Sequence, residues 1–146
     1  MTFYVDGEEQ MALEGSAEKW KELSTFPIPM STQVIAVKCL NNASIPEYGI
    51  VASVKHIYIH DFQHIDEEIF VTDRSWSCSG ELESGWEEVD FQMGDNWKPA
   101  SELEGIYYPD NSTEKLWWQF SPNTPIIWTD DSSDKTVYCR RTIKCK

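Results

Sequence analysis

The chain has 146 residues, and 25 Asp and Glu against 12 Lys and Arg give it a formal net charge of −13. The length suits one domain, and the acidic excess excludes nucleic acid as a partner, because nucleic acids bind basic surfaces. Aromatic residues make up 13% of the chain, which is enough for a folded core, so the composition is not that of an acidic disordered segment.

Short strand-like runs separated by turn residues recur along the chain. Asp6-Gly7 is a strong turn signal directly after the first run, and the last run alternates, with Cys139 on one side and Tyr138 and Arg140 on the other. Strands are predicted, in chain order, at residues 2–5, 33–40, 49–54, 69–72, 125–129 and 136–143. A weak helical signal lies at residues 16–23. The pattern predicts an all-β fold, a sandwich or a closed barrel, in a single domain over residues 1–146.

The acidity is concentrated in one segment of the chain. Residues 61–110 contain fourteen Asp and Glu but only two basic residues, Arg74 and Lys98. We therefore expect one acidic face rather than an acidic surface all round. No run approaches the ~20 apolar residues that span a bilayer, so we expect no membrane insertion. Because residues 2–5 read as a strand rather than a signal peptide, we expect a cytosolic protein or a mature domain or fragment of a longer chain.

The cysteines and two sequons bear on the compartment. None of the four cysteines forms a C-x-x-C pair, so a zinc ribbon is disfavoured, and an even count in a small domain fits two disulfides with three possible pairings. Glycosylation sequons occur at Asn42-Ala43-Ser44 and Asn111-Ser112-Thr113. Four free thiols are ordinary in a cytosolic protein, but these features together favour an extracellular, secreted one. The cysteines are Cys39, Cys78, Cys139 and Cys145.

Three histidines, His56, His60 and His64, are spaced by four residues. On a helix they would share one face and could hold zinc or copper. The intervening Ile57-Tyr58-Ile59 instead favours a strand, in which His64 lies beyond a turn. We therefore favour an exposed or pH-responsive segment over a metal site.

A series of short motifs follows one another along almost the whole chain. In order, they are Phe3-Tyr4-Val5-Asp6-Gly7, Phe26-Pro27-Ile28-Pro29 before Val34–Lys38, Gly49–Ser53, Thr72–Cys78, Gly85-Trp86, Asp90-Phe91, Trp97–Ala100, Ile126-Ile127-Trp128 and Val137–Arg140. This order resembles the sugar-binding jelly-roll domain of beta-galactosidase-type and rhamnosidase-type glycosidases. Residues 54–71 depart from the family's pattern, because they form a longer connection than the family usually has.

The resemblance implies a galactose-binding-domain-like β-sandwich, of the kind found in carbohydrate-binding modules and extracellular adhesion domains. Such a module is not catalytic where it accompanies an enzyme. It also implies the disulfide Cys78–Cys139, because both cysteines lie in matching motifs, and that leaves Cys39–Cys145 as the second pair.

Aromatic and polar residues near position 110 are the candidate sugar site. A pyranose ring needs a flat apolar platform and a few hydroxyl-binding polar groups. Trp117 and Trp118 would face opposite ways on a strand, so only one of them can be core, and we take Trp118 as the platform. The candidate carbohydrate-binding residues are Tyr107, Tyr108, Asp110, Asn111, Trp118 and Arg140. The alternative for the basic end that includes Arg140 is pairing with the acidic central segment.

A structural calcium ion is the candidate cofactor. Asp130, Asp131 and Asp134 lie in one predicted turn, and calcium takes clustered oxygen ligands from such loops. Asp and Ser are also ordinary turn residues, so the turn needs no metal to explain it.

These features lead to a functional hypothesis. The chain carries no G-x-S-x-G, H-E-x-x-H or phosphate-loop motif, so we expect no enzyme. We expect a non-catalytic, lectin-like module of an extracellular protein that binds a glycan or glycoprotein. The alternatives are an extracellular adhesion or structural module that binds protein and an accessory domain of a glycosidase. An oligomer or tandem array would add avidity to a weak single site.

Overall fold

A computed structural model describes residues 1–10, 28–41, 49–61, 64–103 and 124–143. The described part is all-β and contains no helix. Its strands are β1 (Thr2–Val5), β2 (Glu8–Glu9), β3 (Val34–Leu40), β4 (Ser53–Asp61), β5 (His64–Val71), β6 (Ser77–Ser79), β7 (Lys98–Pro99), β8 (Ser101–Leu103), β9 (Ile126–Trp128) and β10 (Thr136–Thr142).

Six of the strands form one antiparallel sheet in the order β2-β1-β3-β10-β6-β7. The remaining four form two separate hairpins, β4–β5 and β8–β9. The described strands do not close into a barrel, so the barrel alternative is not realised in this part of the chain.

The first hairpin shows why the turn signal is reliable. Asp6 and Gly7 both adopt positive φ angles, 49° and 86°, which is the backbone that a tight two-residue turn between twisted strands requires. The Asp6 carboxylate also accepts hydrogen bonds from the backbone N–H groups of Gln33 (2.8 Å) and Val34 (2.7 Å). The turn is therefore joined to the start of β3.

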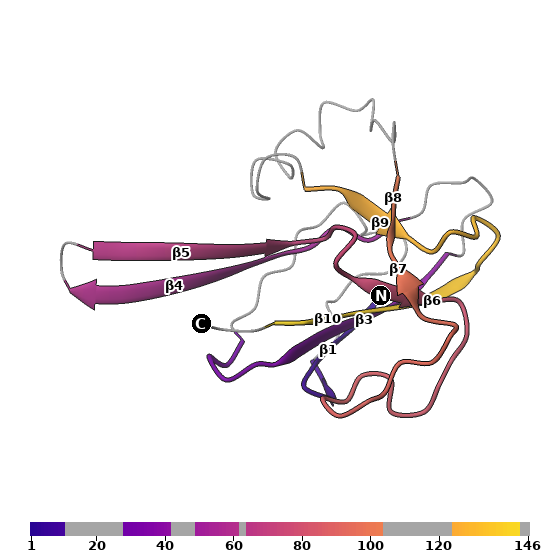
Figure 1. Cartoon of the computed structure of the whole chain (residues 1–146), viewed down its shortest axis with the longest axis horizontal. Helices are drawn as coiled ribbons and strands as arrows, with labels where there is room; N and C mark the ends of the chain where they lie inside the picture. Colours follow the sequence, from indigo (N-terminus) through magenta and orange to yellow (C-terminus); the bar gives the residue numbers. More distant parts are fainter. Residues whose placement is uncertain (11–27, 42–48, 62–63, 104–123, 144–146) are drawn as a thin grey trace.

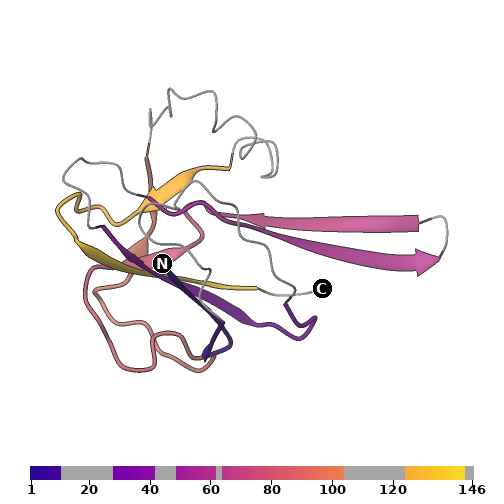
Figure 2. The same cartoon turned by 180° about the vertical axis from the view of Figure 1, so that it is seen from behind.

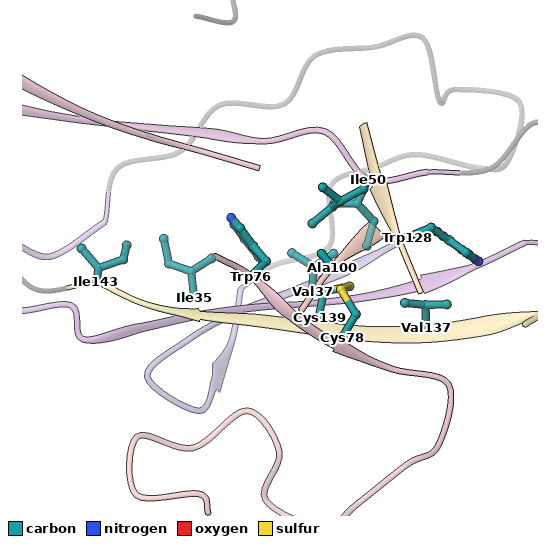
Figure 3. Packing of buried hydrophobic residues seen from close by; sticks show 11 residues of the cluster. Ile35, Val37, Ile50, Trp76, Cys78, Ala100, Trp128, Val137, Cys139 and Ile143 are labelled. Atoms are coloured by element: carbon teal, nitrogen blue, oxygen red, sulfur yellow. A yellow bond between two sulfur atoms is a disulfide. The ribbon is translucent and has the colours of Figure 1, made fainter. Parts of the chain in front are cut away.

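The main core lies on one face of the sheet (Figure 3). The hairpin β8–β9 and Ile50 pack on this face, and Ile127 and Trp128 are completely buried in it. The buried members of the core are Ile35, Val37, Ile50, Trp76, Cys78, Ala100, Ile127, Trp128, Val137, Cys139 and Ile143. The predicted alternation in β10 is confirmed, because Cys139 belongs to this core whereas Tyr138 belongs to the opposite face.

The opposite face of the sheet is covered by residues 80–97, which connect β6 to β7 and which we call the 80–97 loop. Trp86 lies at its centre, stacked on Trp97 and edge-on to Tyr4 and Tyr138. Trp97 donates a hydrogen bond from Nε1 to the Glu83 carboxylate (2.9 Å). This acidic loop is thus held to the sheet by aromatic side chains.

The β4–β5 hairpin projects away from the sheet in both views (Figures 1 and 2). Its register runs from Ser53 opposite Val71 to Asp61 opposite His64, with an irregularity between Ile59 and Asp61. The strand predicted around Ile57-Tyr58-Ile59 is confirmed as β4, and the strand predicted at 69–72 is confirmed for 69–71, the end of β5. The segment that is longer than in the resembled family is therefore this hairpin.

The other predicted strands are largely confirmed. Residues 2–5 match β1, and the runs at 33–40, 125–129 and 136–143 contain β3, β9 and β10. In the predicted run 49–54, Ile50 makes an isolated bridge to Ile127, and only Ser53 and Val54 belong to a strand, β4. The helical signal at 16–23 lies outside the described residues.

Candidate functional site

The predicted sugar site divides between described and undescribed parts of the chain. Five of its residues, Tyr107, Tyr108, Asp110, Asn111 and Trp118, lie outside the described residues. The structure does show the two strands that flank this segment, β8 before it and β9 after it. The last paired residues of β8–β9 are Leu103 and Ile126, so residues 104–125 form the connection between them.

The hairpin that carries this connection is firmly held. Trp128 and Ile127 are completely buried. Ile127 and Ile50 exchange two backbone hydrogen bonds, Ile50 N to Ile127 O (3.0 Å) and Ile127 N to Ile50 O (2.9 Å). The strand that receives the end of the connection is therefore fixed by both packing and backbone pairing.

A third residue, Thr72, fixes the end of the connection directly. Its side chain is completely buried, and its hydroxyl donates a hydrogen bond to the carbonyl of Pro125 (2.7 Å) and accepts one from the N–H of Ala52 (3.3 Å). The hydroxyl thus joins the end of β5 to the residue before β9. Sequence reasoning placed Thr72 in a motif but did not find this role, which only the fold reveals.

Arg140, the described member of the predicted sugar site, lies beneath the 80–97 loop. Only 4% of it is exposed. Its guanidinium donates hydrogen bonds to the carbonyls of Glu88 (2.8 Å) and Phe91 (3.2 Å) and lies 5.1 Å from the centroid of the Phe91 ring. Desolvation by burial lowers the pKa of Arg140 from its usual value. The structure therefore places Arg140 as an anchor of this loop, with little access to a ligand.

The three aspartates predicted to hold calcium are engaged in turn geometry. Asp131 accepts hydrogen bonds from both the N–H (2.8 Å) and the hydroxyl (2.6 Å) of Ser133, and Asp134 accepts one from the Thr129 hydroxyl (2.6 Å). Asp130 is exposed. Across the described ranges, no three His, Cys, Asp or Glu side chains are grouped as metal ligands. The side-chain hydrogen bond from Ser133, followed by its backbone one, lowers the pKa of Asp131.

The predicted disulfide Cys78–Cys139 is present, and it joins β6 to β10 within the main core. Of the second predicted pair, Cys39 has a free thiol and Cys145 lies outside the described residues. Burial raises the pKa of the Cys39 thiol.

The register of β3 and β10 explains why Cys39 and Cys145 do not pair. The N–H of Ile143 bonds the carbonyl of Gln33 (2.7 Å), and Cys39 lies roughly 20 Å further along the extended strand. The two residues from Ile143 to Cys145 reach about 7 Å at most. The two Cα atoms therefore cannot approach within the ~7 Å that a disulfide needs.

Exposed apolar side chains of the 80–97 loop form a feature that the sequence did not single out. Leu82 is 65% exposed, Met93 51% and Val89 39%, although the loop is rich in carboxylates. Their exposure depends on which side of the loop faces the sheet, and no spacing in the sequence indicates this.

Comparisons of the chain with protein-family models, with curated proteins and with solved structures found no match. In the part of the chain that the structure describes, no helix has the length and apolar character needed to cross a membrane. The Cys78–Cys139 disulfide points to an oxidising compartment.

Proposed function

We propose that the protein is a non-catalytic carbohydrate-binding module of an extracellular protein, and that residues 104–125 hold the glycan. One observation carries the proposal: this connection begins and ends at the register pair Leu103–Ile126 of a hairpin whose strand β9 is buried in the main core. Binding residues are commonly found on loops whose ends are held by a rigid scaffold. Connections longer than about 15 residues inside a compact domain are usually functional or linkers.

The composition of the connection supports a sugar ligand. It contains Tyr107, Tyr108, Trp117 and Trp118 beside Asp110 and Asn111. Aromatic faces can stack on the C–H face of a pyranose, and amide and carboxylate groups can bond its hydroxyls. Arg140 no longer belongs to this proposed site, because it is buried under the 80–97 loop.

The proposed fold is a galactose-binding-domain-like β-sandwich with a jelly-roll arrangement. Two features support it: the six-stranded antiparallel sheet and the packing of β8–β9 on one of its faces. The order of motifs is the remaining support. The proposed extracellular location rests on the disulfide and on the two sequons. Calcium is proposed only as an accessory ion near Asp130, because Asp131 and Asp134 are already engaged.

The test is a glycan array probed with the wild-type protein and with Trp118→Ala, each with calcium and with a chelator. We expect binding that free monosaccharide reverses and that Trp118→Ala reduces by about tenfold, the loss of roughly 1.4 kcal/mol of contact. Trp118→Phe is the matched control, since it keeps an aromatic face and should retain most of the binding. The near-UV circular dichroism of each variant reports whether the fold is kept.

No binding to any glycan, with or without calcium, would contradict the proposal and favour the protein-binding alternative. Binding that survives Trp118→Ala in a folded variant would place the site elsewhere. A parent reading frame that continues into a catalytic domain would select the accessory-domain alternative.

A further inference from the structure

The outer backbone edge of β5 is a second candidate binding surface, separate from the proposed glycan site. Among the described residues, β4 and β5 pair only with each other, and their hairpin extends beyond the sheet (Figures 1 and 2). Within the described ranges, each strand therefore presents one row of backbone N–H and C=O groups that no other strand pairs with. Such an edge is a template for the addition of another strand.

The two edges of the hairpin are not equivalent. The register of β4 is interrupted between Ile59 and Asp61, so that one extra residue stands on this strand. A bulge of this kind disturbs the hydrogen-bonding row of its own strand and protects an edge against pairing. The residues of β5 from His64 to Val71 follow one another in the register without an insertion, so β5 offers the more regular edge.

The charges of β5 indicate which strand can be added. Asp66, Glu67 and Glu68 are consecutive at its centre. If β5 of a second copy paired antiparallel with this β5, centred on any of these three residues, acidic residues would face acidic residues. Like charges in facing positions are destabilising. A strand with basic residues at the facing positions would place opposite charges together instead.

We propose that the β5 edge binds an extended basic segment of another protein by strand addition. Backbone hydrogen bonds along residues 64–69 supply the affinity, and the negative charge of the sequence at 66–68 favours a basic partner strand over a second copy of β5. A partner strand cannot pair with Val71, the last residue of β5, because its carbonyl already accepts hydrogen bonds from Trp76 Nε1 (3.0 Å) and Arg141 (2.7 Å).

The test uses a fluorescent, end-capped peptide, Lys-Val-Lys-Val-Val-Lys-Val-Lys, and a control in which the two central valines are prolines. The control keeps every positive charge but removes two amide donors, one on each edge of the peptide strand. We expect saturable binding of the first peptide and about tenfold weaker binding of the second, the effect of one or two lost hydrogen bonds. Amide signals of residues 64–69 should shift in NMR spectra.

Glu67→Lys/Glu68→Lys should weaken binding about tenfold, whereas Asp90→Lys/Asp95→Lys, the same charge change at exposed positions of the 80–97 loop, should leave it within about threefold. Glu67→Gln/Glu68→Gln serves as a milder second variant if the charge reversal disturbs the hairpin. Equal binding of the two peptides would show that charge alone attracts them and would overturn the proposal. Absence of binding, or a dimer formed through the hairpin in analytical ultracentrifugation, would overturn it as well.

Discussion

Cys78 and Cys139 lie directly opposite each other on the neighbouring strands β6 and β10, with their Cα atoms 4.1 Å apart and their sulfur atoms bonded. Strand pairing and the covalent bond therefore hold the same two residues. The disulfide also joins β6, the strand directly before the acidic 80–97 loop, to β10 in the middle of the sheet.

Removing this bond with Cys78→Ser/Cys139→Ser should lower the free energy of unfolding by about 4 kcal/mol, because 61 residues separate the two cysteines. Urea unfolding measures the change, and Cys39→Ser is the control that leaves the bond intact. Peptide mapping under non-reducing conditions should recover Cys78 linked to Cys139 and Cys39 as a thiol. A double variant as stable as the wild type, or a recovered Cys39–Cys145 peptide, would contradict the structure.

Thr72→Val should destabilise the protein by about 1–3 kcal/mol, because it removes the hydroxyl that bonds Pro125 while keeping the side-chain volume. Thr72→Ser keeps the hydroxyl and should cost less. Since Pro125 ends the proposed binding connection, Thr72→Val should also weaken glycan binding while the valine variant remains folded. A valine variant as stable as the wild type would show that the hydrogen bond to Pro125 contributes nothing.

Arg140→Met should cost about 3 kcal/mol, because two charge-assisted hydrogen bonds to backbone carbonyls are lost and those carbonyls stay covered. Limited proteolysis should then cut the 80–97 loop faster. Lys135→Met, at an exposed position, is the control and should change stability little. If glycan binding falls while the stability of the Arg140 variant is unchanged, Arg140 contacts the ligand after all.

The turn at Asp131 should respond to acid. The bonds from Ser133 lower the pKa of Asp131 below 3.8, so the carboxylate stabilises the folded state above pH 3.8 and this contribution is lost as the pH falls through the lowered value. An NMR titration should give a pKa below 3.8 for Asp131, and Ser133→Ala should raise it. A pKa at or above 3.8 in the wild type would contradict the turn geometry, whereas a further drop on adding calcium would support an ion there.

The sequence predicted the strands β1, β3, β9 and β10, but it did not predict the short strands β2, β6, β7 and β8. β1, β3, β9 and β10 are short apolar or alternating runs, and the Asp6-Gly7 turn has a specific backbone requirement, so local patterns suffice for them. Residues 54–71 carry strand signals at Ile57-Tyr58-Ile59 and at 69–72, but no local pattern predicts that these two stretches pair with each other as one hairpin.

The site residues were harder to predict for a physical reason. Arg140 lies in the predicted strand 136–143 on the side opposite Cys139, but its burial depends on Phe91 and Glu88, which are some 50 residues away in sequence. The link from Thr72 to Pro125 spans a similar distance. The pairing of Cys39 with Cys145 was expected by elimination, and only the register of β3 and β10 shows that the chain is too short for it.

The most direct test of the proposed function is an NMR titration that follows the seven tryptophan indole N–H signals as a glycan-array hit is added. We predict that the signal of Trp118 shifts in a saturable way, while those of the buried Trp76, Trp86, Trp97 and Trp128 do not move. A titration in which no indole signal shifts, or in which only the signals of the buried tryptophans do, would contradict a glycan site in residues 104–125.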